Sequence, residues 1–373
     1  MIVLFIRGSE PSMSPAPIGN ASTLDLEAAA PDAVRVRELQ PVDFPRWDEF
    51  VSGCPEATFF HRAGWKTAIE RAFGHRTKFL YAEAGGRIEG VLPLAEVKSV
   101  LFGHALISLP FCVYGGIAAG TERARRLLDE AAVALAEERR VDHLEYRSLT
   151  PHHPEWAHTD LYVTFRKAID SDVERNLNEI PRKQRAMVRK GIKAGLKSGI
   201  DEGVERFFAA YADSVHRLGT PVLSRRYFQI LREVFGSDCE VLTVTRDEGL
   251  VASVMSFYFR DEVLPYYGGG TEQAREVAGN DFMYWELMRR ACERGLRVFD
   301  YGRSKRGTGS FDFKKNWGFE PQPLHYEYRL VKGKRVPEVN PLNPKYRLLI
   351  KLWQRMPLAL ANRIGPLIAR NLG

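Results

Sequence analysis

The feature that most constrains this sequence is an internal duplication. In each half, a helical segment that ends at glycine precedes two strand-like segments, a Tyr-Gly-Gly triplet, a long helical segment and a further strand. Three anchor residues recur at nearly constant offsets. Gly74 and Gly236 are 162 residues apart, Tyr114 and Tyr267 are 153 apart, and Tyr146 and Tyr301 are 155 apart. Because solenoid repeats span ~20–50 residues, a repeat this long indicates a duplicated domain.

The local patterns predict a mixed α/β sheet covered by helices in both halves. The first half is expected to hold helices over 63–73 and 122–139 and strands over 78–82, 88–94 and 143–147. The second half is expected to hold helices over 224–235 and 281–293 and strands over 240–245, 250–259 and 297–301. The triplet at Tyr267 is predicted as a loop whose glycines let a substrate approach the backbone.

The sequence divides into five predicted segments. They are a flexible arm over 1–32, a first domain over 33–170, a basic connecting helix over 171–200, a second domain over 201–336 and a basic amphipathic tail over 337–373. The arm is rich in Ser, Pro and Ala and has no sustained period, which is typical of a flexible segment. Regular structure is expected from about Val34.

Apolar runs in the chain are short. The run Ile2–Ile6 is far below the ~20 residues of a membrane span and is shorter than the core of a secretory signal. The four cysteines form no CxxC pair, which suits free thiols in a reducing compartment. We therefore expect a cytoplasmic protein. The alternative is a cytoplasmic protein that also contacts the inner membrane peripherally.

The net charge of +7 is concentrated in two places. Seven cations and no acid lie between Pro181 and Ile200, and six cations and no acid lie between Val339 and Gly373. Such local basicity predicts an anionic partner. Pro181 is well placed to open a helix over the first cluster. Gly191 in this helix indicates either a close approach to the backbone or a short helix.

The tail after Pro344 has the pattern of a basic amphipathic helix. Arg347, Lys351 and Arg355 form one stripe, with leucines and Trp353 opposite, and a second apolar stretch follows Pro357. Residues 345–370 are therefore candidates for peripheral contact with an anionic membrane. The alternative is that the tail docks on the domain or on a second subunit.

Several common site motifs are missing from the sequence. It contains no GxxxxGK[ST], no GxGxxG after a strand, no HExxH and no GxSxG. P-loop nucleotidase, dinucleotide-binding, zinc protease and serine hydrolase chemistry therefore have no motif to support them. The cluster of His152, His153 and His158 lies among prolines and is predicted to be a loop, so no metal site is expected.

The most informative stretch runs from Phe299 to Phe319. A predicted strand ends at Asp300 and opens into a glycine-rich loop, which leads into Phe-Lys-Lys-Asn-Trp-Gly. Five basic residues and one acid lie between Gly302 and Gly318. This excess predicts a pocket for a phosphate, a carboxylate or a developing oxyanion. The alternative is an exposed basic loop whose aromatic residues pack on the core.

The order Phe299-Asp300-Tyr301-Gly302, then Phe313-Lys314-x-x-Trp317-Gly318, resembles the C-terminal signature of the FemAB-like aminoacyltransferases, within the wider GNAT acyltransferase superfamily. The basic segment between two related halves resembles that family too. The run through NPKYRLLIKLW is similar to the branch associated with exosortase (PEP-CTERM) and exopolysaccharide systems. The resemblance covers about Val34 to Gly373 and implies two tandem GNAT-like (acyl-CoA N-acyltransferase-like) domains with mixed sheets.

The resemblance implies transfer of an aminoacyl or acyl group to an amine of a cell-envelope precursor of peptidoglycan or exopolysaccharide. No tightly bound cofactor is implied, and the donor is either aminoacyl-tRNA or acyl-CoA. Two departures keep the donor open. The interval between Lys197 and Ser224 is too short for the coiled-coil arm of tRNA-using relatives, and no Q/R-x-x-G-x-G/A loop for acyl-CoA is evident.

Site roles follow from the resemblance and from the residue types. Lys314 matches the family's FK-x-x-[FW]-G lysine, and we expect it to stabilise the oxyanion. Asp300 is a candidate general base, although an aspartate at a strand end also forms turns. The residues predicted to bind substrate are Arg182, Arg185, Arg189, Tyr267, Arg303, Lys305 and Trp317. The cations among them are expected to bind the phosphates of a nucleotide-linked or lipid-linked saccharide precursor.

Two other functions compete with an acyltransferase. A non-catalytic scaffold on the membrane surface needs only the tail and tolerates the loss of Lys314. A nucleic-acid-binding protein would use the basic helix and loop, with steep salt dependence. The duplicated α/β pattern and the organised stretch around Lys314 favour the enzyme.

Overall fold

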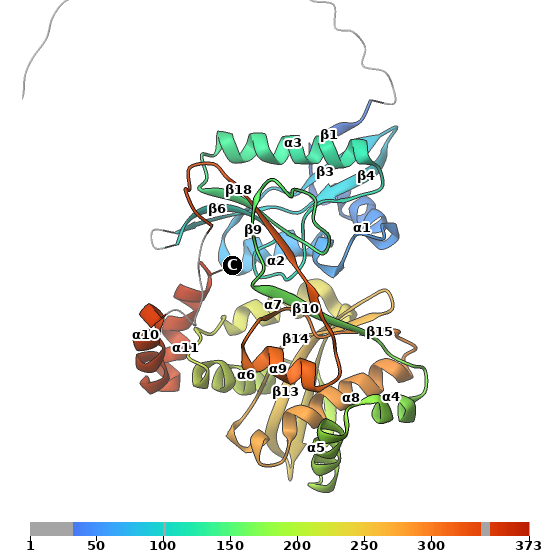
Figure 1. Cartoon of the computed structure of the whole chain (residues 1–373), viewed down its shortest axis with the longest axis vertical. Helices are drawn as coiled ribbons and strands as arrows, with labels where there is room; N and C mark the ends of the chain where they lie inside the picture. Colours follow the sequence, from blue (N-terminus) through green and yellow to red (C-terminus); the bar gives the residue numbers. More distant parts are fainter. Residues whose placement is uncertain (1–32, 100–101, 337–343, 373) are drawn as a thin grey trace, which may run out of the picture.

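The computed structural model describes residues 33–99, 102–336 and 344–372. The predicted arm over 1–32 lies outside the described residues, as does 337–343 of the predicted tail. Figure 1 shows two lobes, one above the other, with two helices of the tail at their side. Within the described ranges, no helix is both long enough and apolar enough to cross a bilayer.

The first half contains two sheets. The four-stranded sheet has the order β1 (Arg35–Glu38), β3 (Leu80–Ala84), β4 (Arg87–Leu92) and β7 (Ala118–Ala119). The six-stranded sheet has the order β2 (Arg76–Thr77), β5 (Ala95–Ser99), β6 (Gly103–Ser108), β8 (His143–Ser148), β18 (His325–Leu330) and β9 (Ala157–Thr159). Its helices are α1 (Phe44–Gly53), α2 (Gly64–Phe73) and α3 (Glu122–Glu138).

The second half is built on one larger sheet. Its order is β11 (Lys197–Asp201), β12 (Cys239–Arg246), β13 (Gly249–Phe259), β14 (Glu262–Gly270), β15 (Val298–Asp300), β10 (Tyr162–Ala168) and β16 (Ser304–Lys305), and β17 (Pro321–Pro323) pairs with β10. Its helices are α4 (Val173–Glu179), α5 (Arg182–Lys193), α6 (Glu205–Arg217), α7 (Arg225–Phe235), α8 (Gly279–Glu293) and α9 (Gly309–Asn316).

The duplication is visible in the strand directions. In the first half β6 and β8 are parallel and are joined through α3, and in the second half β14 and β15 are parallel and are joined through α8. The other strand pairs of the described residues are antiparallel. A parallel pair needs such a crossover connection. The mixed α/β class predicted from the sequence is therefore confirmed.

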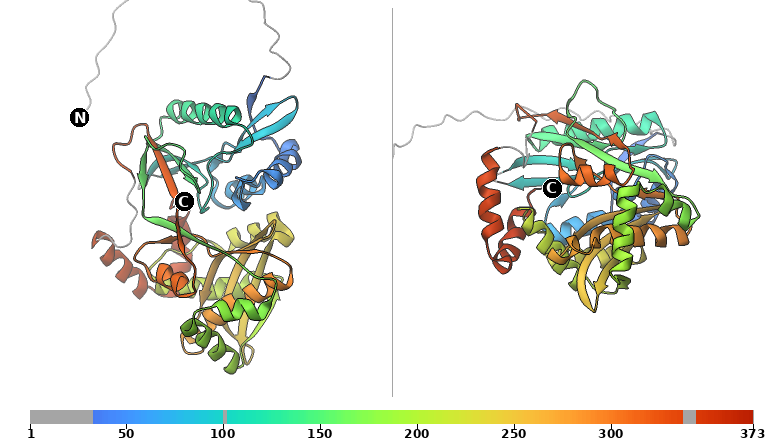
Figure 2. Two further views of the ribbon diagram at one scale, coloured as in Figure 1. Left: turned by 45° about the vertical axis from the view of Figure 1, so that its right-hand side comes forward. Right: turned by 60° about the horizontal axis from the view of Figure 1, so that its bottom comes forward.

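The two halves exchange strands. β10 precedes the connecting helix in sequence but lies in the sheet of the second half, between β15 and β16. β18 follows the second half in sequence but lies between β8 and β9 of the first. Figure 2 shows these strands passing between the lobes. No single cut in the chain therefore separates the sheets of one half from the sheet of the other. The domain boundaries 33–170 and 201–336 remain a prediction.

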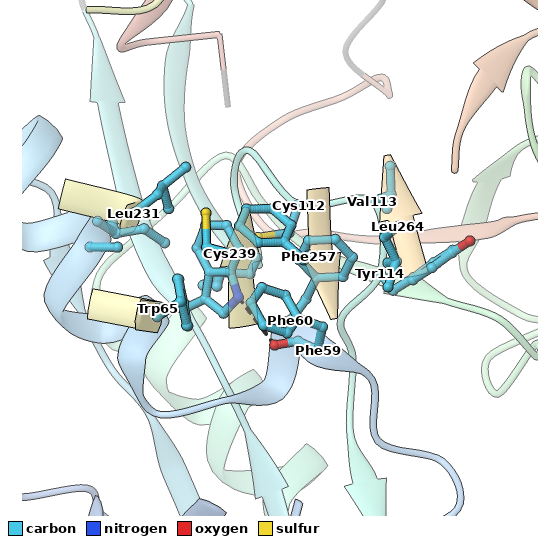
Figure 3. Packing of buried hydrophobic residues seen from close by; sticks show 14 of the residues in the cluster. Phe59, Phe60, Trp65, Cys112, Val113, Tyr114, Leu231, Cys239, Phe257 and Leu264 are labelled. Carbon is cyan, nitrogen blue, oxygen red and sulfur yellow. Dashed lines mark hydrogen bonds between the residues drawn. The ribbon is translucent and has the colours of Figure 1, made fainter. Parts of the chain in front are cut away.

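A shared hydrophobic core fixes the orientation of the halves. Phe59 of the first half stacks on Phe257 of β13 with ring centroids 4.5 Å apart (Figure 3). Trp65 of α2 packs against Phe235 of α7, with ring centroids 5.2 Å apart. Phe59, Trp65 and Phe257 are fully or almost fully buried. Burying one such aromatic side chain contributes ~1.5–3 kcal/mol. The boundary between the halves, here called the seam, is therefore a packed interface.

Local signals explain the helix ends. Gly74 closes α2 in the left-handed region at φ 68°, and the Ser224 hydroxyl caps α7 by accepting the Tyr227 N–H at 3.1 Å. The prediction of a loop at Tyr267 is wrong, because the triplet belongs to β14. A Cβ on Gly269 would lie 2.7 Å from the Ala210 carbonyl oxygen of α6. The close approach is thus made by a helix of the protein itself.

The tail docks mainly on the second half, and its Arg370 also reaches the first half, where it donates to the Phe73 carbonyl. α10 (Pro344–Arg355) and α11 (Leu358–Ala369) both contact α6. Trp353 of α10 accepts a hydrogen bond at its carbonyl from the His216 ring, at 3.1 Å. The docking alternative predicted from the sequence is therefore the arrangement observed for the described part of the tail.

Candidate active site

Asp300 ends β15 and lies at the centre of the seam. Its carboxylate accepts hydrogen bonds from the Tyr114 hydroxyl at 2.8 and 3.1 Å and from the Gly302 N–H at 2.7 Å. The Thr164 hydroxyl lies 3.4 Å away and Arg166 Nε lies 3.3 Å away. Tyr114 belongs to the first half and Asp300 to the second, so this carboxylate joins the halves.

The surroundings of Asp300 leave it no exposed surface. The residue is 0% exposed. Burial raises its pKa, while Arg166 and the Gly302 N–H act in the opposite direction. Arg166 is also ion-paired with Glu262, whose pKa is raised by burial. A carboxylate so enclosed is suited to fixing the position of its neighbours.

Lys314 of α9 lies directly beside this cluster. Its ammonium donates to the carbonyl oxygens of Gly302 and Arg303, both at 3.0 Å. It also lies over the Phe165 ring, 5.7 Å from the centroid. Lys314 therefore anchors the short connection that leaves β15, which carries Arg303 and leads into Lys305 of β16.

The protonation of Lys314 is sensitive to pH near neutrality. Burial, reinforced by the Arg303 guanidinium and opposed by Asp300, lowers its pKa to about 7. An ammonium has three N–H donors, and two of them are used by the loop carbonyls. The third has no partner among the residues that the structure describes.

A cavity of about 210 Å³ opens on the face of the six-stranded sheet and is here called the seam cavity. The residues that line it and matter for binding are Arg147, Tyr162, Arg303, Lys305, Tyr326 and Tyr328. Arg303 lies over Tyr162, 4.7 Å from the ring centroid, and donates to the Tyr326 hydroxyl at 3.1 Å. Burial and Arg303 lower the pKa of Lys305 to about 8.

The seam cavity combines flat aromatic rings with cations. Beneath them, burial opposes the ionisation of Glu145, but Arg147 and His143 hold its pKa at about 2. The ion pair with Glu145 partly neutralises the charge of Arg147. Both acids of this region, Glu145 and Glu327, are buried and do not face a ligand. The surface offered to a ligand therefore comes from Arg303, Lys305 and the tyrosines. Stacking rings with guanidinium donors suit a phosphorylated sugar or nucleotide group.

A second cavity, of about 310 Å³, has Tyr114 in its wall. Thr58, His61 and Ser148 of the first half line it, and Arg166 and Glu262 of the second half face them. Burial lowers the pKa of His61 to about 4, so its imidazole is neutral at physiological pH. The Asp300 cluster therefore borders this second cavity, which Tyr114 and Arg166 line.

The structure does not bring all predicted substrate-binding residues together. Trp317 is 1% exposed and its indole donates to Asp281 at 3.1 Å, so it packs in the core. Tyr267 lies in an aromatic cluster, with its hydroxyl 3.0 Å from that of Tyr227. Neither ring lines the seam cavity or the second cavity. Arg303 and Lys305 line the seam cavity, whereas Lys314 and Asp300 lie beside it and line neither cavity.

The basic helix α5 begins beside α9 but extends away from the seam (Figure 1). Gln184 of α5 and Trp317 both donate to Asp281. Arg182 and Arg189 are exposed, and Arg185 donates to Asn178 at 3.0 Å. No residue of α5 lines either cavity. The close approach predicted at Gly191 is made by α8, because a Cβ there would lie 2.7 Å from Phe282.

Sequence reasoning missed several residues of this region. Tyr114, Tyr162, Thr164, Arg166 and Tyr326 reach the site from β10, β18 and the first half. The recurring Tyr114 was noted only as an anchor of the duplication. The other four carried no signal, because their position depends on the exchange of strands. No group of metal-binding side chains occurs within the described ranges.

Comparison with known proteins gives one family match. Residues 182–315 match the model of an Acetyltransferase (GNAT) domain. No curated protein sequence matches the chain. The second half thus carries a GNAT-type acetyltransferase domain that includes Asp300 and Lys314, and this match supports an acyltransferase-type activity in general.

Solved structures match the whole architecture. FemX has a TM-score of 0.63 and 14% identity, over 85% of this chain and 100% of FemX. A tandem GNAT protein from the clavulanic acid biosynthesis pathway has a TM-score of 0.51 and 12% identity, over 82% and 100%. The C-terminal domain of an Agrobacterium fabrum protein described as a lysylphosphatidylglycerol synthetase has a TM-score of 0.54 and 11% identity. The match covers 77% of this chain and 91% of that domain. At these identities the similarity shows the fold.

Proposed function

We propose that this protein is an N-acyltransferase of the FemAB-like type, which transfers an aminoacyl or acyl group to an amine of a peptidoglycan or exopolysaccharide precursor. The observation that carries the proposal is the environment of Lys314, held between two loop carbonyls with one N–H left over. The link to exosortase systems stays a prediction from the resemblance alone.

In the proposed reaction, the acceptor amine attacks the carbonyl carbon of an ester or thioester. The new C–N bond forms, the bond to the leaving oxygen or sulfur breaks, and the amine proton leaves with the departing group or to water. The free N–H of charged Lys314 stabilises the tetrahedral oxyanion, a role typically worth ~10²–10³ in rate. Asp300 is assigned a positioning role instead of the predicted role as base, because it is fully buried and its carboxylate already accepts hydrogen bonds from Tyr114 and Gly302.

The acceptor is assigned to the seam cavity. Arg303 and Lys305 provide the positive charge for a phosphate group, and Tyr162 and Tyr326 provide faces for a sugar or base. Arg182, Arg185 and Arg189 lie outside this cavity. We therefore assign them to binding a distant part of a large anionic substrate such as tRNA. The cavity therefore favours a nucleotide-linked or lipid-linked saccharide precursor.

The donor is assigned to the second half. In the first half, the segment just before α3 is already occupied, because Glu56 accepts the N–H of Ala119, the last residue of β7, at 3.0 Å and pairs with Arg125 at 2.6 Å. Aminoacyl-tRNA and acyl-CoA both remain candidate donors for the second half.

The proposal is tested by measuring acyl transfer from both donor classes to nucleotide-linked and lipid-linked amine acceptors. We expect Arg303→Gln to raise KM for the acceptor about tenfold, with a smaller change in kcat. Arg306→Gln is the matched control, because Arg306 is an exposed cation on the same loop. Equal effects of the two substitutions would remove the seam cavity from the proposal, and no transfer from either donor would contradict the activity.

A further inference from the structure

The two helices of the tail carry large apolar side chains on their outer surface. Leu349 and Leu352 of α10 are 61% and 53% exposed, and Leu360 and Leu367 of α11 are 45% and 65% exposed. Single exposed leucines are normal in proteins, but a cluster on neighbouring helices marks an interaction surface. These helices form one side of the molecule in Figures 1 and 2.

The orientation of α11 makes the cluster unusual. Its small residues Ala361, Gly365 and Ala369, spaced four apart, are the ones that are buried. A Cβ on Gly365 would lie 2.9 Å from the backbone nitrogen of Val222, so the helix is pressed closely onto the second half. At 100° per residue, Leu360 and Leu367 fall on the opposite side. A helix stabilised only by its own domain turns its leucines inward, and α11 does the reverse.

The packing of α10 leaves Leu349 and Leu352 exposed as well. It is attached mainly through its backbone and one amide: the Trp353 carbonyl accepts from His216, and Gln354 donates to the Arg217 carbonyl at 2.8 Å. Ile350 fills the space above Gly219. These contacts hold the helix in place but do not cover Leu349 or Leu352. The apolar surface is therefore presented on a fixed support.

The charge on the same two helices selects the partner. Lys351, Arg355 and Arg363 are exposed on the same helices, and the sequence has no Asp or Glu after Glu338. A second copy docked symmetrically through this surface would place like charges opposite one another, which is unfavourable. An anionic phospholipid surface accepts both the leucines and the cations.

We propose that this tail surface, made of Leu349, Lys351, Leu352, Arg355, Leu360, Arg363 and Leu367, binds the surface of an anionic bilayer. The helices would lie on the membrane, since no helix of the described chain is long and apolar enough to cross it. Asn371 and Leu372, directly after α11, line the seam cavity. A bound bilayer would therefore lie beside a wall of that cavity, which places lipid-borne molecules near its entrance.

The test is sedimentation of the full chain with phosphatidylcholine vesicles, with and without phosphatidylglycerol. We expect binding only when phosphatidylglycerol is present. The double variant Leu360→Gln/Leu367→Gln should bind at least about tenfold more weakly, and Arg363→Gln about fivefold more weakly. Thermal unfolding should be unchanged in both, because the substituted side chains are exposed.

A matched control separates this surface from the other basic helix. Ile192 and Ile200 are 50% and 40% exposed at and beyond the end of α5. The double variant Ile192→Gln/Ile200→Gln should keep wild-type vesicle binding. Unchanged binding of the leucine variant, or loss of binding in the control, would overturn the proposal. The proposal would also be overturned if the wild type did not bind vesicles and instead formed a dimer, detected by light scattering, that dissociates in the leucine variant.

Discussion

Replacing Tyr114 by phenylalanine removes one hydroxyl from the seam and leaves the ring in place. That hydroxyl donates to Asp300 at 2.8 Å, and the ring packs against Phe60 with centroids 5.8 Å apart. A hydrogen bond to a charged group contributes about 1.5–3 kcal/mol. We therefore expect the free energy of unfolding to fall by about 2 kcal/mol, a large share of the ~5–15 kcal/mol typical of a domain.

The loss should depend on pH in a defined direction. The hydroxyl stabilises the charged form of Asp300, and the pKa of this carboxyl is already raised by burial. Removing the hydroxyl raises the folded-state pKa further. The stability deficit of Tyr114→Phe should therefore be smallest below the unfolded pKa of about 3.9 and grow as the pH rises through the folded-state pKa.

The assay is equilibrium unfolding in urea, followed by tryptophan fluorescence and circular dichroism. Tyr211→Phe is the control, because Tyr211 is also buried but its hydroxyl makes no side-chain hydrogen bond within the described residues. Its unfolding free energy should change by less than about 0.5 kcal/mol. If both variants lose the same stability, the carboxylate cluster does not hold the halves together and the reasoning fails.

The remaining predictions concern Lys314 and the packing of β14. Turnover should fall as the pH rises through about 7, because deprotonation removes the free N–H, and Lys314→Arg should move this fall to higher pH; a rise through pH 7 would make Lys314 a base. An NMR titration of the lysine side chains should place the pKa of Lys314 near 7, and a value of about 10.4 would contradict its burial. Gly269→Ala should lower the free energy of unfolding by about 1–3 kcal/mol, because α6 lies against this glycine. Gly199→Ala should lower it less, since no neighbouring atom lies within 4 Å of a Cβ there. Equal losses of stability would refute this explanation.

Much of the fold is local in origin, and this part was predictable. The helices that end at Gly74 and Gly236 and the long helix from Glu122 are set by caps and periodicity within a few residues. These signals act over one or two turns. Composition and spacing therefore predict the elements and their duplication well.

The exchange of β10 and β18 lay outside such reasoning. Whether a strand joins the sheet of its own half or of the other half depends on which edge is free after folding, and no residue of β18 carries that information locally. The seam cavity depends on the exchange, because Tyr162 comes from β10 and Tyr326 from β18. Arg303 and Lys305 were predicted from the sequence, but Arg147 and the aromatic walls were not.

Burial was the other property that residue types did not reveal. Asp300 and Trp317 stand in the motif around Lys314, and both proved to be enclosed. A motif shows which residues lie near one another in the chain, but a side chain's access to solvent depends on elements that arrive from elsewhere. Here Tyr114 covers Asp300 and α8 covers Trp317.

The most direct test of the central claim is the single-turnover rate of acyl transfer by wild type, Lys314→Ala and Lys315→Ala, with the donor and acceptor found active in the assays above. Lys315 is the exposed neighbour in the same helix and serves as the matched control. We predict that Lys314→Ala lowers the rate at least about tenfold with its circular dichroism spectrum unchanged, while Lys315→Ala keeps the wild-type rate. A folded Lys314→Ala variant with an unchanged rate would contradict the account.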